Sequence, residues 1–340
     1  MGLHHSRHVG VATAALGIWV CSSGFTSTLA DAVDLPPPRS ISELTPAATI
    51  HVGKTADWVA VTDDAVWVGS TGPYAVHRID PKTNRLTASV ALPGEACAGL
   101  ATGFGSLWVP MCTAVPSLAK VDLAGNRLTA VFAVGPAAAE GGVATGAGDV
   151  WLIVDKVGTL ARIDPATGSI RQTVKVPAGS YNPYFSDGQI WVTRADGAGL
   201  TRVDAASGAA YDTVLTGPNP RFLTAAAGAI WTLNQGDGTL TRVDARTRQA
   251  TTTVALGTPG HGGDISYGDG MVWTTMPKVP LSAVDAEAKT LRCQWAGPGG
   301  DSLGIGHGAI WLTDYRAGTI SRIALKDALA HCNPRRSRSE

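Results

Sequence analysis

One histidine and three aspartates in the C-terminal third of the chain are of the types that carry acid–base or metal chemistry. His261 stands in GTPGHGGDIS together with Asp264, and Asp301 and Asp314 follow in the next segments. A histidine beside carboxylates can act as a general base, and carboxylates can hold a divalent metal. The sequence therefore predicts His261 as a catalytic residue and Asp301 and Asp314 as metal ligands. A merely solvated histidine in a glycine-rich loop is the alternative.

The elements that must position these residues are set by a tryptophan repeat. Similar short sequence segments, such as GDVWLIV, GQIWVTR and GAIWLTD, recur every 38 to 43 residues. Repeats of this length decide an architecture before any local pattern does. The repeat is centred on seven of the ten tryptophans: Trp67, Trp108, Trp151, Trp191, Trp231, Trp273 and Trp311.

Each repeat predicts four short strands. A short apolar run and a tight turn precede the tryptophan strand, and a variable loop then leads to a strand of the form LxRID. A turn such as Asp164-Pro165-Ala166-Thr167-Gly168 joins it to a last, alternating strand, because Asp and Pro suit the first positions of a type I turn. Seven such units without helical periodicity predict an all-β protein, a seven-bladed β-propeller of four-stranded antiparallel blades.

The last repeat lacks its turn aspartate, and this predicts how the ring closes. GTISRIAL (318–325) has Ala324 where GTLTRVDA (238–245) has Asp244. The aspartate begins the turn into the last strand of a blade, and no such strand follows Ala324. We therefore expect the N-terminal segment 47–53 to complete the last blade beside 318–323, which removes the open sheet edges.

The propeller would gather the variable loops on one face, around a central funnel. Loops between blades and loops after the tryptophan strands share that face, where function on a rigid scaffold usually lies. We predict that ligand-binding residues converge at the funnel mouth, although a water-filled channel would need polar residues there too. These candidates are Glu140, Tyr181, Arg194, Arg221 and Asp264.

Composition and charge exclude several function classes. The 340 residues contain 27 Lys and Arg and 27 Asp and Glu, so the net charge is close to zero. A neutral chain without a basic, aromatic-lined groove is a poor nucleic-acid binder, and we expect no nucleic-acid partner. We also expect no membrane span and a monomer.

The chain ends predict export and little structure. An apolar run, Val9 to Val20, and the small residues of Ala30-Asp31-Ala32 are typical of a signal peptide over residues 1–32. Secretion or a periplasmic or cell-surface location follows, with lipidation at Cys21 as the less favoured alternative. We assign 33–45 to a proline-rich linker, 46–325 to the propeller and 326–340 to an extension with a basic tail.

The cysteines fit an exported chain. Four remain after cleavage, and an even number outside the cytosol favours disulfides. Cys97 and Cys112 flank AGLATGFGSLWVPM as the far ends of a β-hairpin would, which predicts that they are bonded. Cys293–Cys332 follows by elimination.

With the units aligned, the pattern GxIWVT…LxRIDPxTG…VxVP resembles the exported seven-bladed propellers of the streptogramin (virginiamycin B) lyase-like and YncE/YVTN-type superfamily, over roughly residues 46–325. The lyases use Mg²⁺ to open a cyclic lactone by elimination, with a Pro-His-Gly base loop and a Trp-Phe-Thr-Glu strand end. Here the nearest loop is the longer PGHGGDI, with His261. The tryptophan strands end without glutamate, and only Asp314 offers a carboxylate there.

Two functions follow from these patterns. The first is an exported binding module that needs no cofactor and engages a small molecule, peptide or glycan at the funnel mouth. The alternative is a Mg²⁺-dependent carbon–oxygen lyase of the virginiamycin B lyase type, or a hydrolase, with an incomplete family site.

Overall fold

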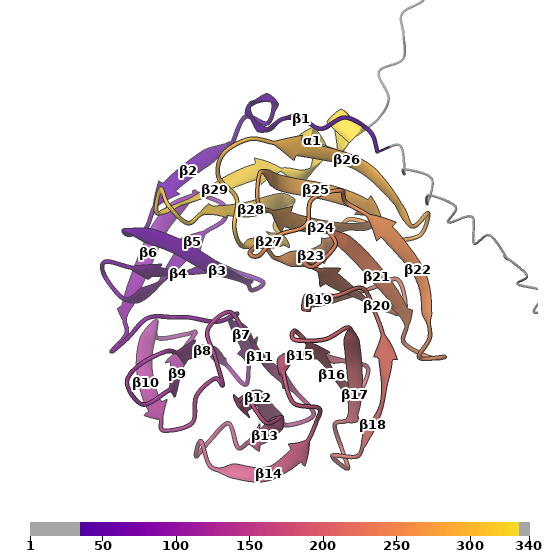
Figure 1. Cartoon of the computed structure of the whole chain (residues 1–340). Helices are drawn as coiled ribbons and strands as arrows, with labels where there is room; N and C mark the ends of the chain where they lie inside the picture. The colour runs from indigo at the N-terminus through magenta and orange to yellow at the C-terminus, as the bar shows by residue number, and fades with distance from the viewer. Residues whose placement is uncertain (1–34, 333–340) are drawn as a thin grey trace, which may run out of the picture. The chain divides into compact units, whose positions relative to one another are not determined.

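Seven antiparallel sheets stand around a common centre (Figure 1). The computed structural model describes residues 35–332, and the predicted signal peptide, Cys21 and the tail 333–340 lie outside this range. Within it, each blade has four antiparallel strands in sequence order from the centre outward, except that the outer strand of blade seven comes from the N-terminal segment and blade six carries a short fifth strand from the same segment. The predicted seven-bladed, all-β propeller is confirmed.

The first four blades follow the repeat along the chain. Blade one contains β3 (Thr55–Val61), β4 (Val66–Thr71), β5 (Ala75–Asp80) and β6 (Arg85–Ala91). Blade two contains β7 (Ala101–Gly103), β8 (Ser106–Met111), β9 (Ser117–Asp122) and β10 (Arg127–Phe132). Blade three contains β11 (Val143–Gly146), β12 (Asp149–Asp155), β13 (Thr159–Ile163) and β14 (Ile170–Lys175). Blade four contains β15 (Ser180–Ser186), β16 (Gln189–Arg194), β17 (Gly199–Asp204) and β18 (Ala210–Leu215).

The last three blades complete the ring. Blade five contains β19 (Pro220–Ala226), β20 (Ala229–Asn234), β21 (Thr239–Asp244) and β22 (Ala250–Ala255). Blade six contains β23 (Ile265–Gly268), β24 (Met271–Met276), β25 (Val279–Asp285) and β26 (Thr290–Ala296). Blade seven contains β27 (Leu303–Gly306), β28 (Ala309–Asp314), β29 (Thr319–Ala324) and β2 (Ala48–His51).

The ring closes through β2, as the missing aspartate predicts. β2 pairs antiparallel with β29, with Ile50 opposite Ile320 and Ala48 opposite Arg322. After Ala324 the chain enters the helix α1 (Leu325–Cys332) and makes no turn back into the sheet. The first and last segments of the propeller are thus bonded to each other, and β2 supplies the outer strand that blade seven would otherwise lack.

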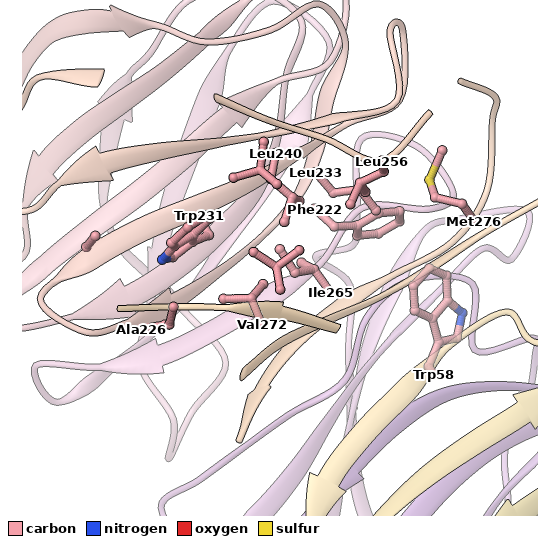
Figure 2. Close-up of a cluster of buried hydrophobic side chains, with 14 residues drawn as sticks. Trp58, Phe222, Ala226, Trp231, Leu233, Leu240, Leu256, Ile265, Val272 and Met276 are labelled. Atoms are coloured by element: carbon pink, nitrogen blue, oxygen red, sulfur yellow. The ribbon is translucent and has the colours of Figure 1, made fainter. Parts of the chain in front are cut away.

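The seven repeat tryptophans fill the layers between blades. All are at most 1% exposed. Trp67 of blade one packs with Leu107 and Val121 of blade two, and Trp231 of blade five packs with Val272 of blade six (Figure 2). A blade cannot bury both of its faces alone, so these contacts supply the inter-blade core.

The turn aspartates are structural, as expected. Asp164 Oδ1 accepts the backbone N–H groups of Ala166 and Thr167 at 2.7 and 3.2 Å. Asp80, Asp204, Asp244 and Asp285 cap their own turns through Oδ1 in the same way, and Asp122 does so through Oδ2. They lie at the opposite end of the blades from the loops that were expected to carry function.

The two ends of the described chain pack on the outside of blades six and seven. β1 (Arg39–Ser40) pairs parallel with β26, a short 3-10 helix (Ile41–Glu43) follows, and Leu44 is buried beside Trp295. Part of the proline-rich segment is therefore attached to blade six. No helix among the described residues is long and apolar enough to cross a membrane.

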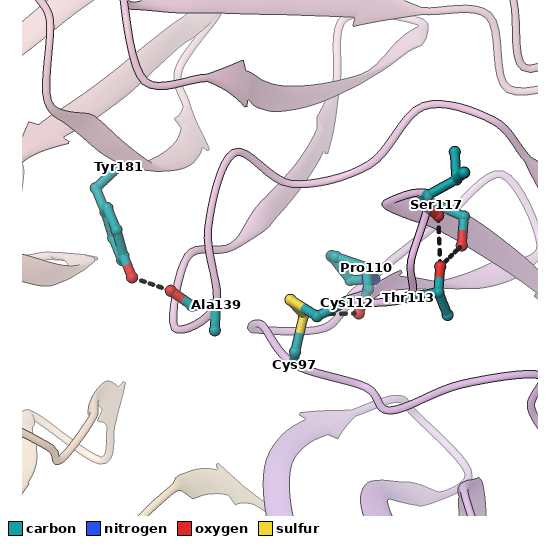
Figure 3. The surroundings of a disulfide bond; sticks show 8 residues. Cys97, Pro110, Cys112, Thr113, Ser117, Ala139 and Tyr181 are labelled. Atoms are coloured by element: carbon teal, nitrogen blue, oxygen red, sulfur yellow. Dashed lines mark hydrogen bonds between the residues drawn. A yellow bond between two sulfur atoms is a disulfide. The ribbon is translucent and has the colours of Figure 1, made fainter.

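Both predicted disulfides are formed. Cys97 and Cys112 join the loop before β7 to the end of β8, with a Cα–Cα distance of 5.6 Å (Figure 3). Cys293 and Cys332 join β26 to α1, with a Cα–Cα distance of 5.2 Å. The first bond holds a loop of the functional face, and the second ties the C-terminal helix to the ring.

Candidate functional site

A cavity of about 320 Å³ occupies the centre of the ring. Every blade contributes the residue that lies eight positions before its tryptophan. These residues are Val59, Leu100, Val143, Pro183, Leu223, Ile265 and Leu303. Because the inner strands start at the inter-blade loops, residues nine and ten positions before the tryptophan lie nearer the end of the channel that carries those loops. We call this end the mouth.

Two aromatic side chains meet across the channel below the mouth. Trp58 of blade one and Phe222 of blade five have ring centroids 6.0 Å apart, and their exposed fractions are 4% and 3% (Figure 2). Each lies nine residues before the tryptophan of its blade. Since blades one and five are not neighbours, this contact spans the ring. We call it the aromatic floor.

A backbone irregularity directs Trp58 to this contact. The pairing of β3 with β4 shifts between Asp57 and Val59, and Trp58 has a φ of 55°. A positive φ is unfavourable for a bulky side chain and is costly unless the surroundings hold it. Asp57 Oδ1 accepts the Trp58 N–H at 2.7 Å and so supports this conformation.

Asp57 and Asp301 form a carboxyl pair at the mouth. Burial raises the pKa of Asp57 well above its usual range, and the Asp301 and Glu140 charges raise it further. Burial also raises the pKa of Asp301, while a hydrogen bond with the Asp57 carboxyl favours its ionised form. Among residues 35–332 no lysine or arginine lies within 4.0 Å of either carboxyl. Burial and the neighbouring charges thus make the pair harder to ionise than two ordinary aspartates.

Asp264 is held in place by backbone and hydroxyl donors. Its carboxylate accepts Ser302 Oγ at 2.6 Å, Ile265 N at 2.8 Å and Leu303 N at 3.3 Å. Burial nevertheless raises the pKa of Asp264 to about 6, because these hydrogen bonds only partly offset the lost solvation. Since Ser302 and Leu303 belong to blade seven, Asp264 joins blades six and seven beside the Asp57–Asp301 pair.

Tyr181 and Arg221 form the opposite side of the mouth. The Arg221 guanidinium lies over the Tyr181 ring, 4.3 Å from its centroid, and Nη2 donates to the Tyr181 hydroxyl. The hydroxyl in turn donates to Ala139 O (Figure 3). Glu140 lies beside this contact, and its N–H donates to Cys97 O at 2.7 Å, so the disulfide supports the Glu140 loop.

Repeated threonines fix the backbone of the mouth. Thr193 Oγ1 accepts the Asn182 N–H at 3.2 Å and donates to Arg221 O of the next blade at 2.9 Å. Thr275 Oγ1 likewise accepts the Asp264 N–H at 2.7 Å and donates to Asp301 O. Each threonine lies two residues after the tryptophan of its blade. The scaffold thus positions the mouth residues through inter-blade hydrogen bonds.

Of the predicted site residues, His261 and Arg194 lie apart from this arrangement, and Asp314 borders it, because the Asp314 charge raises the pKa of Asp301. His261 is exposed, and no side chain or backbone group among residues 35–332 hydrogen-bonds to its ring. Asp314 Oδ1 caps its own turn by accepting Arg316 N and Ala317 N. Arg194 bonds to Asp196 and to Ala178 O within its own blade.

The described residues give no assigned site for Mg²⁺, although this ion needs only one or two carboxylates when it keeps several of its waters. In the described part of the chain no three histidine, cysteine, aspartate or glutamate side chains are grouped so that they could hold a metal ion. Mg²⁺ prefers an octahedron of oxygen ligands, several of them from protein or substrate. We derive no step through this ion, and the catalytic and metal roles of His261, Asp301 and Asp314 stay predictions.

Two residues of the mouth were missed in the sequence, Asp57 and Tyr315. Tyr315 borders the mouth with 40% exposure, and burial and the Glu95 and Asp57 charges raise its pKa. Asp57 could have been found by the repeat alone. It lies ten residues before its tryptophan, and the residues at that place in blades four, five and seven are Tyr181, Arg221 and Asp301.

Comparison with solved structures places the ring among known propellers. The chain is similar to a streptogramin B lyase structure, with a TM-score of 0.66 and 14% identity over 81% of this chain and 96% of that chain. It is also similar to BamB from Moraxella catarrhalis, with a TM-score of 0.59 and 12% identity over 82% of this chain and 97% of that chain.

The propeller fold that the repeats predict is therefore confirmed. No protein-family model matches the sequence, and no curated protein matches it. At 14% and 12% identity these structural likenesses concern the fold, so the function has to be argued from the mouth itself.

Proposed function

We propose that this protein is an exported binding module that engages a small molecule, peptide or glycan at the mouth of its channel. The observation that carries the proposal is the Asp57–Asp301 pair, two carboxyls held close together without a lysine or arginine within 4.0 Å among residues 35–332. Buried carboxylates are normally paired with a cation or a full set of donors. A ligand that brings an ammonium group or hydroxyl donors would provide them.

The surroundings support binding in three further ways. The aromatic floor crosses the channel next to the pair and offers a ligand at the mouth two apolar ring surfaces. The inter-blade hydrogen bonds of Thr193 and Thr275 hold the mouth in place before any ligand arrives, and a preformed site loses less entropy on binding. The two disulfides are of the kind that persists in an oxidising, extracytoplasmic compartment.

Thermal shift with chemically distinct probes tests this function. The probes are cadaverine as an amine, maltotriose as a glycan and an N-acetylated, C-amidated trialanine as a neutral peptide. Because a ligand that binds only the folded state raises the melting temperature, we expect at least the amine to raise that of the wild type. Asp57→Asn should abolish the shift, whereas Asp212→Asn, an exposed outer-strand aspartate of β18, should preserve it. No shift with any probe would contradict the proposal.

The same proteins separate binding from the lyase alternative. Isothermal titration with Mg²⁺ would give heat in the wild type and none in His261→Ala if a Mg²⁺-dependent lyase site existed. The binding module predicts the same result in both proteins. Binding of Mg²⁺ that is lost in His261→Ala would contradict the binding module and favour the lyase alternative.

A further inference from the structure

Arg221 is a second charged group of the mouth without an opposite charge in contact. No carboxylate among residues 35–332 lies within 4.0 Å of its guanidinium, and its Nε is buried without a hydrogen-bond partner. The Tyr181 ring and hydroxyl nevertheless fix the group in one orientation. A guanidinium that is held rigidly and left without a carboxylate is suited to binding an anion.

Arg221 and Asp57 face each other over the aromatic floor. Both lie ten residues before the tryptophan of their blades, at the same level of the channel. The residues that follow them, Phe222 and Trp58, are the pair whose ring centroids are 6.0 Å apart. The carboxyl pair and the guanidinium therefore belong to blades on different sides of the channel, each next in sequence to one ring of the aromatic floor.

Glu140 shows that the two sides are within electrostatic reach of each other. The Asp301 charge raises the pKa of Glu140, whereas the Arg221 charge lowers it. One side chain, in the loop between blades two and three, thus responds to both groups. A ligand of a few atoms in length would respond to both as well.

We infer that the ligand of this mouth is dipolar, with an ammonium group on the Asp57–Asp301 pair and a carboxylate on Arg221. The class is that of an amino acid or a short peptide with free termini. This inference rests on the proposed function, because it assigns chemistry to the same site. A ligand with one charge would leave either the carboxyl pair or the guanidinium without a partner, and a dipolar ligand satisfies both.

A matched set of linear probes tests the dipole. 5-Aminopentanoate carries both charges, pentylamine carries the ammonium alone and pentanoate carries the carboxylate alone, and glycine and 6-aminohexanoate vary the separation. Isothermal titration gives the affinity of each. We expect 5-aminopentanoate or one of its length variants to bind the wild type about tenfold or more tighter than pentylamine, as one charge-assisted bidentate contact provides.

Substitutions then assign each charge to its side. Arg221→Gln should remove the advantage of the amino acid and leave the affinity for pentylamine within about twofold. Asp57→Asn should weaken both, and Asp212→Asn should weaken neither. Far-ultraviolet circular dichroism and the melting temperature of each variant show that the ring is intact.

The outcomes distinguish this inference from the proposed function. If pentylamine binds as tightly as every amino acid in the wild type, the anion side is refuted while binding at the pair stands. The same holds if Arg221→Gln weakens pentylamine as strongly as it weakens the amino acid. If none of the probes binds and the earlier panel also gives no shift, both proposals are refuted.

Discussion

Two acidic sites at opposite ends of the blades differ in whether an arginine neutralises the carboxylate. Asp149, at the turn end of blade three, is buried and contacts Arg162 at 2.5 Å and Arg171 at 2.6 Å. Asp57 and Asp301, at the mouth, have each other and no such cation within the described chain. Where a carboxylate serves the fold, the sequence supplies its counter-charge. At the mouth it supplies none, which leaves that place for a ligand.

The pKa values of the aspartates also shift in opposite directions at the two ends of the blades. Hydrogen bonds from backbone N–H groups lower the pKa of Asp80, Asp164 and Asp244. Burial and a neighbouring carboxyl raise the pKa of the mouth aspartates instead. The substitutions below replace acids at the two ends and should therefore give effects of opposite sign.

The largest effect is expected at the turn end. Asp149→Asn removes the charge that two arginines share, and breaking such a buried ion pair costs about 3 kcal/mol of unfolding free energy. Urea denaturation measures this loss, with Asp212→Asn as the matched control. A loss below about 1 kcal/mol would show that the pair is not important to the fold.

The same substitution at the mouth should stabilise. The folded state raises the pKa of Asp57, so it binds more protons than the unfolded state, and stability falls as pH rises from the unfolded value near 4 through the raised value. Asp57→Asn keeps an acceptor for the Trp58 N–H and lacks the charge. It should exceed the wild type at pH 8 by ~1.4 kcal/mol for each unit of raised pKa, and match it at pH 4. Urea denaturation at both values checks this. Equal stability at pH 8 would contradict it.

A smaller loss is expected at a turn. Asp164→Ala removes the acceptor of the Ala166 and Thr167 N–H groups and one contact of Arg171. Because the turn is exposed, we expect a loss of about 1 kcal/mol in the same urea assay. An increase in unfolding free energy, as expected for Asp57→Asn, would contradict the claim that the turn carboxylates stabilise the fold and the mouth carboxylates do not.

The smallest effect is expected at His261, which is exposed and makes no side-chain contact in the described chain that could be lost. His261→Ala should change the unfolding free energy by less than about 0.5 kcal/mol and leave probe affinity unchanged. A strong loss of ligand affinity would mean that the loop folds over the mouth when ligand binds.

Sequence spacing could predict the fold because each blade repeats its own local signals. The tryptophan fixes the inter-blade layer, and the aspartate fixes the last turn, so that even its replacement by Ala324 predicts the closing strand. Glu140, Tyr181, Arg221 and Asp301 could be placed at one mouth for the same reason.

The finer arrangement depends on contacts that no local pattern carries. Trp58 meets Phe222 across the ring from a strand irregularity that the segment TADWVAV does not reveal, although the place of Asp57 follows from the repeat spacing. The direction of the His261 loop is set by Gly262 and Gly263 with φ of 102° and 94°. Glycine tolerates such values but does not specify them, so the sequence cannot say where that histidine points.

The most direct measurement is a pH titration of the aspartate carboxyl ¹³C signals in the wild type and in Asp57→Asn. The account predicts a wild-type carboxyl signal whose pKa lies well above the ordinary aspartate range and which is absent from the variant. If the same set of high-titrating carboxyls is found in both proteins, Asp57 is ionised like any surface acid, and the unneutralised pair at the mouth does not exist.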